Sequence, residues 1–246
     1  LPDNAVQLIR NQDHEAVTEL VRLEKDVDLI IPRGGPDLIE TVLKETRIPV
    51  IKHMRGMCHL FVDKSANQEM ALKVIENAKC QKVETSNSIE TVLVHEAIAQ
   101  NFLPKLSEKL TTDNVELRGD KEARHIVSTM KEATEEDWNT EYQALVLSVR
   151  VVPTVEAAIE HVNRYGSHHS DGIIAEDEAA TNIFTRSAES AVVYINASTR
   201  FTNGPEFGMG ADIGVSTDKL HARGPIGIEE LTTYRYVVSG NGQIRE

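Results

Sequence analysis

The sequence is poor in cysteine, in aromatic residues and in long apolar runs, and each scarcity excludes a class of protein. Its only cysteines, Cys58 and Cys80, make no disulfide framework, which fits a reducing cytoplasm. No apolar run approaches the roughly 20 residues of a membrane-spanning helix. The first twenty residues carry too much charge for a signal peptide. Aromatic residues make up 4% and hydrophobic residues 40%, so we expect a core built mainly from aliphatic side chains.

Positive charge is also scarce. The chain has 26 Lys and Arg against 39 Asp and Glu, a net charge of −13 over 246 residues. This balance argues against a nucleic-acid surface and against docking on anionic membranes. Of nine histidines only His168 and His169 are close in sequence, and adjacent residues do not give the spacing of a zinc site. We therefore expect no metal, nucleic-acid or membrane partner.

Apolar and amphipathic stretches alternate along the chain, which is typical of a parallel α/β layer. The pattern predicts two α/β regions that meet near Gly56. The predicted strands of the first region are 5–9, 27–31 and 48–51, with helices at 14–23 and 37–45. The predicted strands of the second are 59–63, 91–95, 115–117, 144–152, 171–175 and 191–195, with a last strand at 231–238. Its predicted helices are 67–79, 97–110, 121–130, 155–165 and 178–187.

Two connections between these elements stand out. Gly34-Gly35 follows a predicted strand and precedes a helix, so it either lets a ligand phosphate approach the helix N-terminus or forms a tight turn. A glycine-rich loop begins near Asn196, and such a loop in a compact domain is usually functional or disordered; the flanking strands favour a functional one. The acidic run 132–137 predicts a solvated surface segment.

The stretch from Asn77 to Val94 reads as a helix end, a short polar loop around Ser86 and an apolar strand. Such a loop fits either an ordinary connection or a reactive residue held at a cleft. A serine hydrolase is disfavoured because there is no Gly-x-Ser-x-Gly elbow and the nearest histidine in sequence, His95, lies nine residues away past a strand. Cys58 and His59 are strand neighbours that point to opposite faces, so they form no catalytic pair. Cys58 is interpreted as a small packed residue.

The same stretch resembles the nucleophile segment of the γ-glutamyl phosphate reductase (glutamate-5-semialdehyde dehydrogenase) family, within the aldehyde dehydrogenase superfamily. The resemblance rests on Asn-Ala-Lys-x-Gln from Asn77 and on Glu-Thr-x-Leu-Val from Glu90. It extends along essentially the whole chain. Its most specific segments are 196–202, 206–211 and 219–227.

This resemblance implies an aldehyde dehydrogenase-like α/β fold. Residues 1–56 would form a partial Rossmann-type NADP-binding domain and residues 57–223 the α/β catalytic domain. Residues 224–246 would form a C-terminal strand and tail that serve oligomerisation, giving a homo-oligomer. The chain is expected to correspond to the later three-fifths of a family polypeptide, with the cofactor lysine and the oxyanion asparagine in the portion before Leu1.

The resemblance also implies site roles. Ser86 stands where the family has its nucleophilic cysteine, and Cys80 is a poor substitute on the preceding helix. The backbone N–H of Asn87 would help to stabilise an oxyanion, or Asn87 is a cap or turn residue. The implied cofactor contacts are Arg33, Gly34, Gly35 and Glu141, the last of which is otherwise a solvated carboxylate. The implied substrate contacts are Arg200 and Arg223, which otherwise form surface salt bridges.

The implied reaction is the NADPH-dependent reduction of γ-glutamyl phosphate to glutamate-5-semialdehyde and phosphate, in proline biosynthesis in the cytoplasm. Ser86 and the absent front half are expected to impair this copy. The alternative is a catalytically inactive relative that acts as a binding or structural subunit, or a gene remnant.

Overall fold

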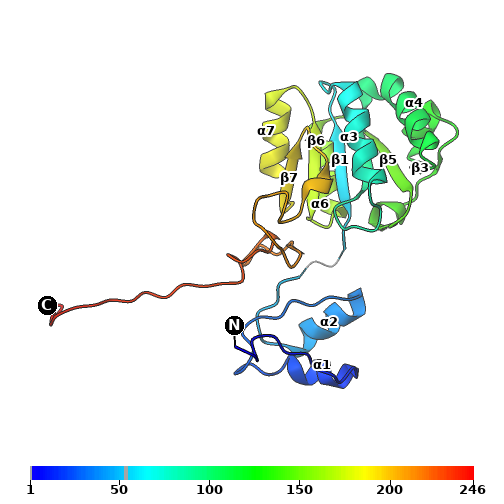
Figure 1. The fold of residues 1–246 in the computed structure, drawn as a ribbon. Helices are drawn as coiled ribbons and strands as arrows, with labels where there is room; N and C mark the ends of the chain where they lie inside the picture. The colour runs from blue at the N-terminus through cyan, green and yellow to red at the C-terminus, as the bar shows by residue number, and fades with distance from the viewer. Residues whose placement is uncertain (1, 53–54) are drawn as a thin grey trace.

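The computed structural model describes residues 2–52 and 55–246. Figure 1 shows a small N-terminal lobe, a larger α/β lobe and a C-terminal segment that extends away from both. No helix among the described residues is long and apolar enough to cross a membrane.

A seven-stranded sheet organises the large lobe, in the order β4-β3-β5-β2-β1-β6-β7. Every neighbouring pair is parallel. The strands are β1 (Cys58–Val62), β2 (Ile89–His95), β3 (Glu116–Gly119), β4 (Lys131–Glu132), β5 (Val146–Val152), β6 (Ser170–Ile174) and β7 (Val192–Ile195). All residues of β1, β2 and β6 are buried, as expected for strands covered on both faces. The predicted parallel α/β fold is confirmed.

Helices cover both faces of this sheet (Figure 1). They are α3 (Gln68–Cys80), α4 (Glu96–Thr112), α5 (Lys121–Ile126), α6 (Val155–Tyr165) and α7 (Glu178–Ser187). Because side chains alternate along a strand, Leu60 packs in the cluster with α3, α4 and α5, whereas Phe61 packs in the cluster with α6 and α7. A side-chain cap begins each of them. In each helix one backbone N–H of the first turn donates to the side chain of the capping residue, and these residues are Asn67, His95, Asp120, Thr154 and Asp177.

The predicted helices 155–165 and 178–187 are confirmed to the residue, whereas the helix predicted at 121–130 ends at Ile126. Gly166 follows α6, and its φ of −66° is not left-handed. A Cβ at this position would lie 2.4 Å from the carbonyl oxygen of Val162. Close approach, rather than backbone angle, is therefore what favours glycine here.

The small lobe differs from its prediction. Its described residues form α1 (His14–Leu20), α2 (Pro36–Glu45) and one parallel bridge, between Ile30 and Val50, where strands 27–31 and 48–51 were expected. The strand expected at 5–9 is wrong, since Val6 and Leu8 lie 87% and 85% exposed in an irregular segment. An apolar run becomes a strand only where neighbouring strands accept its hydrogen bonds and cover its side chains.

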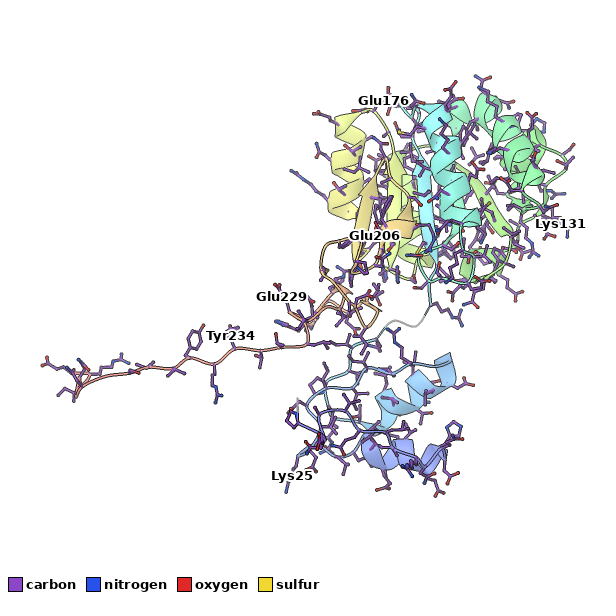
Figure 2. All side chains as sticks on the ribbon, in the orientation of Figure 1. Lys25, Lys131, Glu176, Glu206, Glu229 and Tyr234 are labelled. Atoms are coloured by element: carbon purple, nitrogen blue, oxygen red, sulfur yellow. The ribbon has the colours of Figure 1, made fainter. Side chains whose placement is uncertain are left out.

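The strand predicted at 231–238 is also wrong. The C-terminal part has one hairpin, β8 (Val215–Ser216) with β9 (Gly224–Pro225), and the chain beyond it pairs with no strand among the described residues. Its apolar side chains stand in solvent, Tyr234 among them (Figure 2). The segment that follows β8 instead contacts the small lobe: Lys52 forms an ion pair of 2.8 Å with Asp218.

The acidic run 132–137 is only partly a solvated surface. Asp137 is buried and accepts hydrogen bonds from Thr134, Arg118 and Tyr142. Burial opposes ionisation, but these donors outweigh it and lower the pKa of Asp137 to about 2. The prediction failed for this residue because two of its partners come from β3 and from the segment before β5, which a local charge count does not include.

Candidate active site around Ser86

Ser86 occupies a tight turn at the amino end of β2. The N–H of Ser88 donates to the carbonyl of Thr85 at 2.9 Å, so Ser86 and Asn87 are the central residues of the turn. Gly56 supports the turn from behind, because a Cβ there would lie 2.3 Å from the Cα of Ser86. Ser86 itself is half-buried. The turn thus presents one hydroxyl between α3 and the buried sheet.

A histidine faces this hydroxyl, contrary to the expectation that none lies near Ser86. Ser86 Oγ and His169 Nε2 are 3.1 Å apart, although the residues are 83 positions apart in sequence. His169 directly precedes β6, which pairs with β1, and β1 pairs with β2. In a parallel sheet the amino ends of neighbouring strands meet at one edge, and this brings the two residues together.

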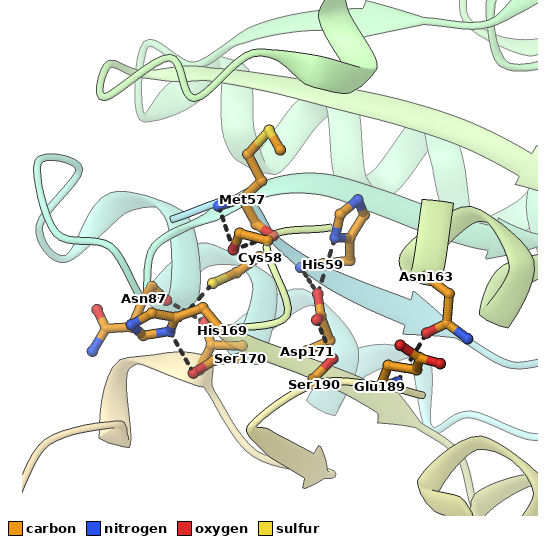
Figure 3. Close-up of polar contacts among 12 residues, drawn as sticks. Met57, Cys58, His59, Asn87, Asn163, His169, Ser170, Asp171, Glu189 and Ser190 are labelled. Carbon is orange, nitrogen blue, oxygen red and sulfur yellow. Dashed lines mark hydrogen bonds and ion pairs between the residues drawn. The ribbon is translucent and has the colours of Figure 1, made fainter. Parts of the chain in front are cut away.

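A chain of hydroxyl groups lies behind His169. His169 Nδ1 is 2.8 Å from Ser170 Oγ, which is 2.7 Å from Thr202 Oγ1. Thr202 Oγ1 is in turn 2.7 Å from the hydroxyl of Tyr194. Figure 3 shows His169 and Ser170 side by side. Both residues are fully buried. Burial, as the largest cause, raises the pKa of Tyr194 to about 12, so its phenol keeps its proton.

Two thiols lie near the turn, and neither competes with Ser86 as a nucleophile. Cys58 is fully buried, donates to the carbonyl of Ser86 at 3.1 Å, and has a pKa raised by its burial. It is a packed thiol, as predicted. Burial also raises the pKa of Cys80 on α3. A high pKa keeps a thiol protonated and therefore weakly nucleophilic.

Asn87 anchors the turn to the loop that follows β7. Its side-chain Nδ2 donates to the carbonyl of Thr202 at 3.1 Å, and its own carbonyl accepts from Thr199 Oγ1 at 2.6 Å. The side chain therefore serves the turn, which is one of the two roles predicted for this residue. Its backbone N–H as an oxyanion donor stays a prediction.

Of the two arginines predicted to bind substrate, the structure brings one to the turn. Arg200, in the 3-10 helix Thr199–Phe201, donates to Thr85 Oγ1 at 2.7 Å and to Gln81 Oε1 at 2.8 Å. Burial lowers the pKa of its guanidinium. Arg223 instead donates to the carbonyl of Glu189. Both substrate roles stay predictions, and only Arg200 is placed beside Ser86.

The residues predicted to hold the cofactor are spread over both lobes. Gly35 caps α2, and a Cβ there would meet nothing within 4 Å, so the N-terminus of α2 is open enough to hold a phosphate group. Arg33 packs over Gly214 beside the β8–β9 hairpin. Glu141 is half-buried in the large lobe, where its charge adds to the effect of burial in raising the pKa of Glu90. Among the described residues, no group of three or more metal-ligating side chains is present.

The sequence interpretation missed a buried ion pair behind the Ser86 turn. Lys79 Nζ lies 2.6 Å from Glu90 Oε2, and both side chains are almost fully buried. Burial is the largest cause in both groups: it lowers the pKa of Lys79 and raises that of Glu90 to about 7. The available signal was Glu90 itself, the one carboxylate in a mostly apolar strand.

Another buried histidine, His59, lies on the face of β1 opposite to Cys58. His59 Nδ1 is 2.9 Å from Asp171 Oδ1, and Ser190 donates to the other oxygen of Asp171. Figure 3 shows Cys58 and His59 pointing to opposite sides of the strand, which confirms that they do not form a catalytic pair.

Comparison with known proteins gives a consistent result. No protein-family model matches the chain. The γ-glutamyl phosphate reductase of Caldanaerobacter subterraneus is 51% identical over 246 residues, which cover all of this chain and 59% of that protein. The crystal structure of the Thermotoga maritima γ-glutamyl phosphate reductase superposes with a TM-score of 0.95 at 46% identity, covering 98% of this chain and 58% of that one.

An acetylating aldehyde dehydrogenase from Geobacillus thermoglucosidasius shares the fold, with a TM-score of 0.73 at 18% identity over all of this chain and 63% of that one. The chain spans about three-fifths of the length of the relatives that it matches. It is homologous over that whole span to the γ-glutamyl phosphate reductases and has the aldehyde dehydrogenase fold.

Proposed function

We propose that this chain forms the acyl-transfer part of an NADP-dependent γ-glutamyl phosphate reductase, which converts γ-glutamyl phosphate to glutamate-5-semialdehyde and phosphate. The observation that carries the proposal is the position of residue 86. The residue at the family's nucleophile position lies half-buried on a rigid turn, with Arg200 bound to the residue before it. The 51% identity to a reductase over the full chain supports the same substrate class.

The chain's own residues would bind and orient the acyl phosphate. Arg200 offers a guanidinium, which matches a phosphate or carboxylate with two parallel hydrogen bonds. The nicotinamide nucleotide supplies a hydride when it is bound, and Gly34 and Gly35 at the start of α2 would hold one of its phosphates. Arg33, Glu141 and Arg223 complete the proposed cofactor and substrate contacts.

Ser86 makes this copy a poor reductase within the proposal. The family's cysteine forms a thiolate and then a thioester that stays electrophilic toward hydride. A serine forms an oxygen ester, which accepts hydride far less readily. The same residue favours the second candidate, a catalytically inactive relative that acts as a binding or structural subunit.

The remaining parts of the proposal concern organisation. Residues 1–56 belong to the cofactor domain, 57–223 to the catalytic domain and 224–246 to a tail that joins copies into a homo-oligomer. Two free cysteines fit a cytoplasmic location.

The test exchanges the nucleophile. With the N-terminal portion of a family polypeptide joined before Leu1, Ser86→Cys should give phosphate-dependent reduction of NADP by glutamate-5-semialdehyde at a rate several orders of magnitude above that of the Ser86 form. Removed nucleophiles typically cost this much. The matched control is Cys80→Ala in both backgrounds, which should change neither rate.

Equal rates for the Ser86 form and the Ser86→Cys variant would overturn the assignment of this turn. Loss of activity with Cys80→Ala would place the nucleophile on α3 instead. An inactive Ser86→Cys variant that still binds the nucleotide would favour the binding-subunit candidate.

A further inference from the structure

The contact between Ser86 and His169 suggests chemistry that needs no hydride. We propose that these two residues form a nucleophile–base pair that hydrolyses acyl phosphates and activated esters through an acyl ester on Ser86, without any nicotinamide nucleotide. The inference relies on the proposed function only for the choice of acyl phosphate as the substrate class. The pair itself stands on the 3.1 Å distance between Ser86 Oγ and His169 Nε2.

The surroundings of His169 favour the tautomer that a base requires. A histidine accepts a proton from serine through Nε2 only when Nδ1 carries the hydrogen. Nδ1 lies 2.8 Å from Ser170 Oγ, and a hydroxyl oxygen can accept this hydrogen because its own proton can be donated to Thr202 Oγ1. When Nδ1–H donates to Ser170, Ser170 to Thr202 and Thr202 to Tyr194, the Nε2 lone pair faces Ser86.

Cys58 favours the same tautomer independently. Its Sγ donates to the carbonyl of Ser86 at 3.1 Å, so its one proton is engaged. The sulfur also lies 3.9 Å from His169 Nδ1, toward which it offers only a lone pair. Because the Cys58 proton is engaged elsewhere, this contact favours a hydrogen on Nδ1, which Ser170 Oγ can then accept.

Arg200 suits the leaving group. It contacts Thr85, the residue before the nucleophile, so its guanidinium lies beside the place where an acyl phosphate would react. A fixed cation stabilises the negative charge on phosphate as it departs. Ser86 itself is half-buried rather than fully buried.

The two steps balance without an oxidant or reductant. In the first, Ser86 Oγ bonds to the acyl carbon, the bond from that carbon to the phosphate oxygen breaks, and His169 Nε2 takes the serine proton while phosphate leaves with the bonding electron pair. The imidazolium then gives its proton to the departed phosphate. In the second step His169 Nε2 takes a proton from the water that attacks the acyl carbon and passes it to Ser86 Oγ as the ester bond breaks, and the carboxylic acid that forms loses its proton to solvent. The products are a carboxylate and phosphate.

The chemistry should be slow because the group that faces His169 Nδ1 is a neutral hydroxyl. In the Ser-His-Asp triads of known hydrolases, loss of the correctly placed aspartate lowers kcat by about 10⁴-fold. Here the hydroxyl chain orients the ring but adds no charge to stabilise the imidazolium. The nearby carboxylate of Asp171 pairs instead with His59, on the other face of β1.

The test uses the 246-residue chain as it stands, with acetyl phosphate and p-nitrophenyl acetate and no nucleotide. We expect steady hydrolysis of both that falls at least tenfold in Ser86→Ala and in His169→Asn. Cys80→Ala, the matched control for a reactive thiol, should stay within twofold of the parent. Mass spectrometry of acid-quenched samples should find the acetyl group on the peptide that contains Ser86.

A second variant keeps the test valid if His169→Asn does not fold. His169 is fully buried, so Thr202→Val, which removes only the hydroxyl behind Ser170, is added as a milder change. A positioning role predicts a lower kcat with little change in KM. The inference is overturned if the parent hydrolyses no faster than Ser86→Ala, or if the acyl group is found on Cys58 or Cys80.

These outcomes separate the two proposals. Hydrolysis by the parent without any reductase activity in Ser86→Cys would keep this inference and reject the proposed function. Reductase activity in Ser86→Cys without hydrolysis by the parent would do the opposite.

Discussion

The two lobes respond differently to the same kind of sequence. Each contains short apolar runs separated by amphipathic helices, yet the large lobe forms seven paired strands and the small lobe forms one bridge, Ile30 to Val50. In the large lobe β1 is fully buried, whereas the apolar side chains of Val6 and Leu8 lie in solvent. Apolar patterning therefore fixes a strand only when the partner strands are present to complete it.

The difference extends to polar groups. The large lobe buries Lys79, Glu90 and Asp171 with specific partners, which is tolerable only where the surrounding structure holds those partners in place. The ion pairs of the small lobe, such as Arg22 with Glu45, lie at its surface. The Ser86 turn lies in the large lobe, where polar side chains are buried with specific partners.

The largest predicted contrast is in core truncation. Ile75→Ala, on α3, should lower the free energy of unfolding by an amount near the top of the range of about 2–5 kcal/mol, because its fully packed site cannot collapse around the cavity. Ile39→Ala, the matched change on α2, should lower the free energy of unfolding by an amount near the bottom of that range. Urea unfolding followed by circular dichroism would measure both. An equal or larger cost at Ile39 would show that the small lobe is as tightly packed as the large one.

The next effect is pH dependence that originates in the large lobe. Burial raises the pKa of Glu90 from 4.5 to about 7, so the folded state holds its proton more tightly than the unfolded state does. The contribution of Glu90 to the free energy of unfolding is therefore fully present below about pH 4.5. It is lost as pH rises toward 7, and the loss is at most about 3 kcal/mol. Glu90→Gln should remove this slope between pH 5 and 8. The control is Glu132→Gln at an exposed position, which should retain the pH dependence of stability. An unchanged slope in Glu90→Gln would contradict the raised pKa of Glu90.

The C-terminal tail should affect association rather than stability. Serine in place of Tyr234, Tyr236 and Val238, which are 77%, 84% and 92% exposed, should change the unfolding free energy by less than about 0.5 kcal/mol. If this apolar segment joins copies of the chain, the substitutions should convert oligomers to monomers in light scattering. A parent that is already a clean monomer of 27.3 kDa at high concentration would remove the basis for that expectation.

The smallest effect concerns the nucleotide. With a single bridge in place of a full layer, the small lobe should bind NADPH with a Kd of about 1 mM or weaker. At about 1 mM NADPH that affinity stabilises the fold by no more than about 0.4 kcal/mol. Fluorescence titration would give the affinity directly. Micromolar binding would show that the open N-terminus of α2 suffices, and loss of binding on Gly35→Asp would locate it there.

Local signals in the sequence determined much of the large lobe. The helices 155–165 and 178–187 were predicted to the residue, and in the structure a capping side chain starts each. The burial of Cys58 and its separation from His59 followed from strand alternation. The position of Ser86 in a polar turn between helix and strand also followed from local pattern.

Only the tertiary structure decided what faces that turn. His169 lies 83 residues from Ser86, and nothing in local pattern reveals that β6 pairs beside β1 and so brings the histidine to the amino end of β2. The predictions for Asp137 and for strands at 5–9 and 231–238 were wrong because they used local pattern alone. Two of the partners of Asp137 come from β3 and from the segment before β5, and the two expected strands have no partner strand among the described residues. Helix caps and side-chain periods act over a few residues and can be read directly, whereas strand pairing and polar contacts join distant segments. The sequence therefore determined where Ser86 would lie, and the order of strands in the sheet determined that a histidine would face it.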